Sequence, residues 1–146
     1  MTSFPLALTD LTTLVDDRIY ESQWRPQLDR AGVYLLEIDV RHVSRREDFF
    51  DCAATGLGLG PDERLRKWSG LEDRIWGALA EHPADSGALV LRHADAMAGP
   101  ALGDLLQAVG VFTDLAKAVG PGHEGSFPRD VQLFVILTGS GDSFPP

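Results

Sequence analysis

The sequence has a single cysteine, Cys52, among its 146 residues, so no internal disulfide bond is possible. This favours a reducing compartment, or at least argues against a secreted disulfide scaffold. The N-terminal sequence MTSFPLALTDLTTLVDD has no basic start, and Asp10 interrupts its short apolar stretch. Neither a signal peptide nor a membrane span has that pattern. We therefore expect a cytoplasmic protein that does not enter a membrane.

Basic residues are also scarce: 13 lysines and arginines face 22 aspartates and glutamates, which gives a net charge of −9. Proteins that bind phosphate backbones normally offer clustered cations. Direct binding of nucleic acid is therefore not expected. The acidity has two interpretations. It keeps the protein soluble, or it matches a protein partner that is itself basic.

Patterns typical of enzymes and metal sites are missing. No two of the four histidines stand at a metal-ligand spacing (His42, His82, His93 and His123). His93 and Asp95 follow an apolar run, where α/β enzymes often place catalytic groups, but the same pair is common in turns. Cys52 lies on an apolar helical face and is expected to be a core thiol. The GLGLG stretch at 56–60 lacks the lysine of a phosphate loop. We predict no catalysis, no cofactor and no metal.

The composition, 44% hydrophobic and 24% charged, fits a single soluble domain. A chain of this length buries about two-thirds of its unfolded surface and needs no metal or disulfide for stability. Leu8, Leu11, Val15 and Ile19 recur at helical spacing, with Thr9 or Asp10 as the cap. We therefore expect a helical extension over 1–31, a main domain over 32–140 and a tail over 141–146.

Three apolar runs in the main domain, at 32–40, 87–92 and 131–139, have the length and composition of buried strands. Helical patterns separate them. One begins at a capping box formed by Ser44 and Glu47, a second ends near Pro83, and a third spans 100–120. Helical crossovers imply parallel strands. The predicted fold is α/β, with a small three-stranded parallel sheet packed against helices and the helical extension at the N-terminus.

The segment KWSGLEDRIWGAL, residues 67–79, combines two tryptophans with two adjacent acids. On a helix, its apolar side chains form a stripe about 100° wide, as a core-facing helix requires (Trp68, Leu71, Ile75, Ala78 and Leu79). Glu72 and Trp76 then share one flank, and Asp73 points towards solvent. Trp76 either covers the rim of the core or anchors a partner that the acids attract.

Six segments in this order resemble the barstar family of intracellular inhibitors of guanyl-specific ribonucleases such as barnase. They are the strand at 32–40, IDVRHVSRREDFFDCAATGLGL, WSGLEDRIWGAL, GALVLRHADAM, LLQAVGVFTDLAKAVG and VQLFVILTG. The likeness covers about residues 32–140 and lies in the order of the pieces. It implies a three-stranded parallel sheet packed against helices, and an acidic helix with its preceding loop that plugs the active site of a basic ribonuclease.

When the family pattern is aligned with this sequence without gaps, Trp68 corresponds to the second aromatic residue of the binding loop. Asp73 then corresponds to the first Asp of the binding helix, and Trp76 to the Trp of that helix. An acid on the last long helix corresponds to Asp114. The sequence departs from the family at Gly77, which takes the place of the dominant contact Asp, and Lys67 and Leu71 also differ. The implied partner contacts are Trp68, Gly70, Glu72, Asp73, Trp76, Gly77 and Asp114.

The resemblance implies an inhibitor, monomeric when free, that gives a bacterial cell immunity to a ribonuclease toxin. A carboxylate can occupy the place of the phosphate that the enzyme binds. Gly77 and the basic run RLRK at 64–67 leave alternatives open. The target differs from a barnase-like enzyme, or Glu72 and Asp73 have taken over the contact, or inhibition is lost. In the last case the protein is an immunity or adaptor protein for another basic partner.

Overall fold

The sheet has four parallel strands in the order β1-β4-β3-β2. The computed structural model describes residues 12–60, 62–121, 127–141 and 144. Within them, the strands are β1 (Thr12–Asp16), β2 (Tyr34–Asp39), β3 (Ser86–Arg92) and β4 (Gln132–Gly139). Register places Leu36 beside Leu89 and Leu89 beside Val135. The α/β class and the parallel sheet are thus confirmed.

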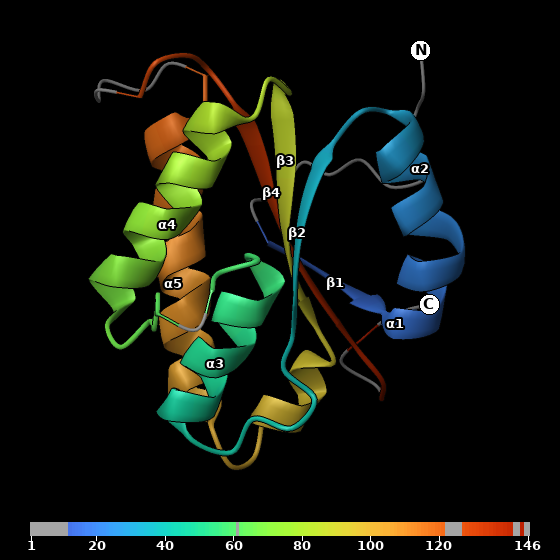
Figure 1. Cartoon of the computed structure of the whole chain (residues 1–146). Helices are drawn as coiled ribbons and strands as arrows, with labels where there is room; N and C mark the ends of the chain where they lie inside the picture. The colour runs from blue at the N-terminus through green and yellow to red at the C-terminus, as the bar shows by residue number, and fades with distance from the viewer. Residues whose placement is uncertain (1–11, 61, 122–126, 142–143, 145–146) are drawn as a thin grey trace.

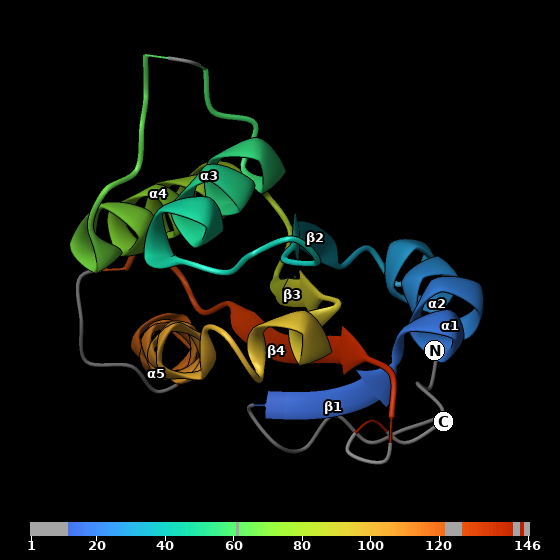
Figure 2. The same ribbon diagram turned by 90° about the horizontal axis from the view of Figure 1, so that it is seen from below.

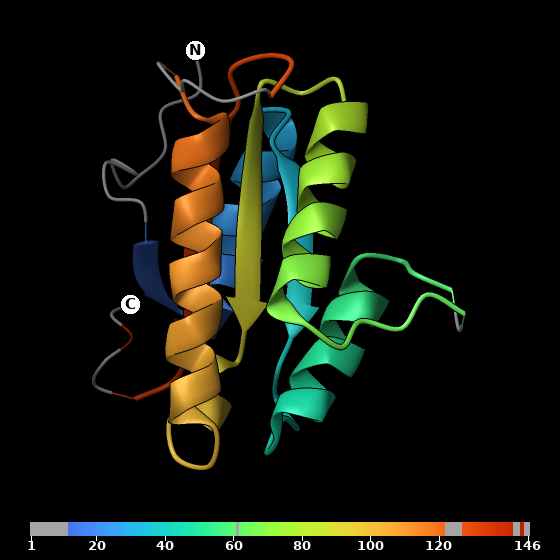
Figure 3. The same cartoon turned by 90° about the vertical axis from the view of Figure 1, so that its left-hand side faces the viewer.

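Helices cover both faces of the sheet (Figures 1 and 2). One layer consists of α3 (Arg46–Gly56), α4 (Trp68–Glu81) and α5 (Leu102–Val119), with the short 3-10 helix η2 (Ala94–Met97) after β3. On the other face, α1 (Asp17–Ile19), the π-helical turn η1 (Tyr20–Trp24) and α2 (Arg25–Arg30) form one continuous segment. In Figure 3, α4 and α5 run in the same direction in front of the sheet. None of the described helices combines the length and the hydropathy that a bilayer-spanning helix requires.

One prediction about the N-terminal part is wrong, and a second is only partly confirmed. The sheet has four strands rather than three. In the region predicted as a helical extension, residues 17–30 are helical, but Thr12–Asp16 form the strand β1. Val15 therefore belongs to a strand, while Leu8, Thr9, Asp10 and Leu11 lie outside the described residues. Apolar spacing alone suited a helix, but Thr12, Thr13 and Val15 are β-branched and favour a strand. Pairing with β1 also satisfies the open edge of β4.

Separate cores lie on the two faces of the sheet. The larger one joins side chains of β2, β3 and β4 to α3, α4 and α5, and includes Phe49, Ile75, Leu89 and Phe112. The smaller one packs the N-terminal segment on the opposite face through Tyr20, Trp24 and Leu28. The helical residues 17–30 thus form a layer on the second face of the sheet, and β1 joins its edge.

Individual residues determine where α3 begins and how closely its last turn approaches the sheet. Asp48, rather than the predicted Glu47, accepts hydrogen bonds from the backbone N–H groups of Ser44 and Arg45, both at 3.1 Å. These bonds lower the pKa of Asp48. At the other end, a Cβ on Gly56 would lie 2.4 Å from the carbonyl oxygen of Glu37 in β2. A residue without a side chain lets the last turn of α3 approach the sheet this closely.

Candidate functional site

Helix α4 presents one apolar stripe to the core and leaves its other sides towards solvent. Leu71, Ile75 and Leu79 are buried, as their spacing predicted. Lys67 is the N-cap and its side chain makes no capping hydrogen bond. The helix ends at Glu81, just before the predicted stop at Pro83. The core stripe fixes the rotation of α4 and therefore decides which of its residues a partner could reach.

Trp76 lies at the border of this stripe and is partly buried. Its indole meets the ring of Phe127 edge to face, with centroids 4.8 Å apart and planes at 85°. Arg129, two residues further on, donates hydrogen bonds to the carbonyl oxygens of Leu79 in the last turn of α4, at 2.9 Å, and of Ala84 after the helix, at 3.0 Å. The segment that leads into β4 thus supports one side of the indole and leaves part of it open.

The two acids next to Trp76 are exposed. Neither Glu72 nor Asp73 has an ion-pair partner among the described residues, and the neighbouring Arg74 pairs with Glu63 at 3.1 Å. Asp114 is also exposed, on the adjacent helix α5. Carboxylates left free in this way keep their full attraction for a cationic partner.

The remaining predicted contacts lie at the start and on the outer side of α4. Trp68 packs mainly on α3, with its ring centroid 5.3 Å from that of Phe49 and 5.0 Å from that of Phe50. Gly70 lies one turn before Arg74, partly buried beside the loop that precedes the helix. Trp68 therefore packs against two aromatic rings of α3 and is only partly exposed.

Gly77 forms part of a hollow between α4 and the loop after α3. A Cβ at this position would meet no atom within 4 Å beyond its own stretch of helix. The hollow has a volume of about 440 Å³, and its lining residues come from the loop and from α4 (Leu57, Leu59, Asp73, Arg74, Gly77, Ala78 and Glu81). This hollow was not predictable from the sequence, in which Leu57 and Leu59 belong to a glycine-rich stretch that ends a helix.

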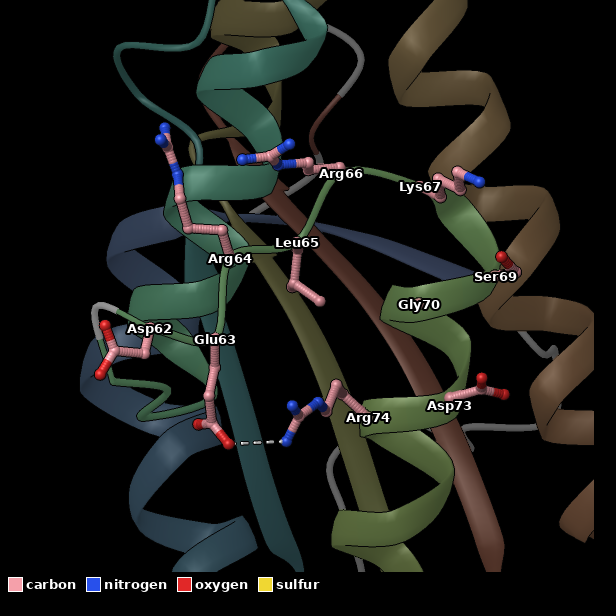
Figure 4. A pocket seen from close by; sticks show the side chains of 10 residues that line it. All are labelled: Asp62, Glu63, Arg64, Leu65, Arg66, Lys67, Ser69, Gly70, Asp73 and Arg74. Carbon is pink, nitrogen blue, oxygen red and sulfur yellow. Dashed lines mark hydrogen bonds and ion pairs between the residues drawn. The ribbon is translucent and has the colours of Figure 1, made fainter.

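A basic loop precedes α4. Arg64, Arg66 and Lys67 are exposed and have no ion-pair partner in the part of the chain that the structure describes. Figure 4 shows the side chains of Arg64 and Arg66 reaching towards α3, while Leu65 between them is turned inward and buried. The loop borders a second hollow of about 440 Å³, which Asp73 and Arg74 also line. Positive and negative groups thus lie side by side at the beginning of α4.

Polar residues also gather at the carboxyl edge of the sheet, where α/β proteins often bind ligands. Arg92 at the end of β3 donates to Asp17 through two bonds of 3.0 and 2.8 Å. Burial raises the pKa of Asp17, but the hydrogen bonds from Arg92 and Thr138 outweigh this and lower it. These groups satisfy one another, and the sequence did not single out Asp17 or Thr138.

His93 follows Arg92 and adopts a left-handed backbone with φ of 61°. Its Nε2 atom lies 2.8 Å from the guanidinium of Arg41, and its backbone N–H donates to Thr138 at 3.1 Å. Asp95, which the sequence pairs with His93, accepts a hydrogen bond from Ser140 at 3.2 Å. The two side chains thus have separate hydrogen-bond partners, and Nε2 of His93 also lies 3.6 Å from the carboxylate of Asp17. The bonds of Asp17 to Arg92 and Thr138 join the N-terminal layer to the carboxyl ends of β3 and β4.

Cys52 is partly buried, and burial together with nearby carboxylates raises the pKa of its thiol. A thiol of this kind is less readily ionised and therefore less reactive. Over the described stretches of the chain, no group of three or more histidine, cysteine, aspartate or glutamate side chains could hold a metal ion.

No protein-family model, curated protein or solved structure gives a significant match to this chain. The resemblance to the barstar family therefore stays a prediction that depends on the order of six sequence segments.

Proposed function

We propose that this protein inhibits a guanyl-specific ribonuclease by covering the enzyme's basic active site with α4 and the neighbouring side of α5. The observation that carries the proposal is the flank of α4 itself. Glu72 and Asp73 are exposed and unpaired within the described residues, beside the partly open indole of Trp76. An aromatic anchor next to free carboxylates has the composition of a binding hot spot.

The arrangement of the fold is consistent with this proposal. From β2 to β4 the chain follows the strand and helix order that the family resemblance implies, and α3, α4 and α5 cover one face of the sheet. Asp114 lies on α5, the helix next to α4. Carboxylates on two adjacent helices could therefore face one cationic cleft, in which each takes the place of a phosphate group.

Titration of purified guanyl-specific ribonucleases with the protein tests the proposal. We expect RNA cleavage to be lost at one equivalent of inhibitor, and the complex to weaken as salt rises, because exposed charges are screened. The variant E72Q/D73N should inhibit less and depend less on salt. The matched variant D29N/E47Q removes the same charge from α2 and from the first turn of α3, and should inhibit like the wild type. Full cleavage at a large excess of protein would contradict the proposal.

Two features that differ from the barstar-family pattern favour a second function. Gly77 supplies no carboxylate where the family has its dominant contact, and the basic loop with Arg64, Arg66 and Lys67 lies beside the acids of α4. These features favour an immunity or adaptor protein for a different basic partner. Tight binding of a ribonuclease without loss of its activity would support this alternative.

A further inference from the structure

The hollow at Gly77 combines an apolar wall with two carboxylates. Leu57 and Leu59 come from the loop that follows α3, and Gly77 and Ala78 from α4; all four are partly buried. Asp73 and Glu81 stand one helical turn before and one turn after Gly77, so the three positions share one side of the helix. The space that Gly77 leaves open, because it has no side chain, therefore lies between Asp73 and Glu81 along the helix.

The charge at this hollow is negative. Asp73 and Glu81 are exposed, and neither has an ion-pair partner within the described part of the chain. Arg74 also lines the hollow, but its guanidinium is held by Glu63 at 3.1 Å. A cation that enters between the two acids therefore meets attraction from both and little opposition from Arg74.

We propose that this hollow receives an arginine side chain of the partner protein. The aliphatic part and the flat face of a guanidinium group pack well on apolar surface such as Leu57 and Leu59. Its N–H groups can then donate to Asp73 or Glu81 in charge-assisted bonds. The volume of about 440 Å³ lies within the range of small ligand pockets, about 300–1,000 Å³, and admits one such side chain.

This inference rests on the proposed function, because it describes how a basic target would meet α4. It also offers a physical role for the departure at Gly77. The barstar family has a carboxylate at this position of the binding helix, whereas this chain has the hollow at Gly77. The contact with the partner would then be made by Asp73 and Glu81 on the adjacent turns. The partner contributes the projecting side chain instead.

A size series at Gly77 tests the proposal. G77A and G77L both replace a glycine inside a helix by a strong helix former, so both should raise the melting temperature. Only leucine fills the hollow. Against a ribonuclease that the wild type inhibits, G77L should raise the inhibition constant at least about tenfold, while G77A should stay within about threefold. Equal inhibition by G77L and the wild type would overturn the inference and leave the proposed function standing.

A second measurement needs no ribonuclease. Isotope-labelled protein is titrated with the peptide acetyl-Gly-Arg-Gly-amide while its backbone amide NMR signals are followed. We expect saturable shifts at Leu57, Leu59, Gly77 and Ala78, and none with the citrulline peptide, which keeps the shape of arginine without its charge. D73N/E81Q and G77L should abolish the shifts, and D29N should not.

The two measurements separate the possible results. Localised arginine binding with no ribonuclease inhibited would support the hollow and reject ribonuclease inhibition. Absence of localised shifts, equal shifts with the citrulline peptide, or shifts that persist in G77L would each overturn the hollow as an arginine site, whatever the outcome of the inhibition assay.

Discussion

The indole of Trp76 and the ring of Phe127 meet edge to face at 4.8 Å, although the two residues are far apart in the sequence. Phe127 is almost fully buried, at 4% exposure, whereas Trp76 is only partly covered. An inner ring that is fixed by the core therefore supports an outer ring that faces a potential partner. This support limits the positions of the indole before binding, which reduces the entropy cost of forming a complex.

We expect F127A to lower the free energy of unfolding by about 3 kcal/mol, because it removes a buried aromatic side chain and leaves a cavity. F127L should cost less, since it fills part of the same space. Urea denaturation followed by circular dichroism measures both. The fluorescence of Trp76, obtained by difference from W76F, should show greater solvent exposure in F127A. Wild-type stability and fluorescence in F127A would contradict this role of Phe127.

The pair formed by Asp17 and Arg92 predicts a loss of stability in acid. Both side chains are 14% exposed, and the hydrogen bonds from Arg92 and Thr138 lower the pKa of Asp17 despite its burial. A lowered pKa stabilises the folded state above the ordinary value of 3.8, and this stabilisation is lost as the pH falls through the folded-state value. We expect D17N to be less stable than the wild type by about 3 kcal/mol at neutral pH.

Urea denaturation over a range of acidic pH measures this effect. The difference between D17N and the wild type should shrink as the pH falls, since Asp17 in the wild type becomes protonated and loses its charge. D29N, which changes an exposed acid of α2, serves as the control and should follow the wild type. A difference that is independent of pH would show that Asp17 acts through packing and not through its charge.

The main domain was predictable from the sequence because its signals are local and strong. The apolar runs that became β2, β3 and β4 have the length of buried strands, and the spacing of Leu71, Ile75 and Leu79 is helical. The strand β1 was not predictable in this way. Its short TTLVD segment follows a leucine pattern that also fits a helix, and its pairing depends on β4, which lies more than a hundred residues further along the chain.

The candidate site was predictable only along α4. Helical periodicity placed Trp76 at the edge of the core stripe with Glu72 on the same flank, and turned Asp73 towards solvent. In the structure both acids are exposed and Trp76 is partly buried. Phe127 and Leu57, by contrast, approach α4 from loops, and helical periodicity does not relate a loop residue to a helix. Such contacts depend on the path of the connections, which the local pattern does not encode.

Tyr20 predicts a complementary loss of stability in base. It is fully buried at 0% exposure, and its hydroxyl donates a hydrogen bond to Glu37, which Arg25 also holds at 2.8 Å. Burial, the bond to Glu37 and the charge of Glu37 all raise the pKa of Tyr20. A raised pKa stabilises the folded state below the ordinary tyrosine value of about 10, and this stabilisation is lost as the pH rises beyond it.

We therefore expect alkaline pH to destabilise the wild type more than Y20F, which is less stable at neutral pH by about 1 kcal/mol because one hydrogen bond is missing. Near-ultraviolet absorbance checks the same point. Of the two tyrosines, Tyr20 should ionise only as the protein unfolds. Ionisation of Tyr20 in the folded protein near its ordinary pKa would contradict the prediction.

If Trp76 anchors the partner, W76A should weaken the complex with an inhibited ribonuclease by about 2 kcal/mol, or roughly thirtyfold in the inhibition constant. W76F keeps an aromatic ring against Phe127 and should lose much less. Because Trp76 also contacts the core, the stability of each variant is measured separately by urea denaturation. Trp24 is buried on the opposite face of the sheet, so W24F controls for the general effect of losing an indole. Inhibition by folded W76A that equals that of W24F would place the contact surface elsewhere on the protein.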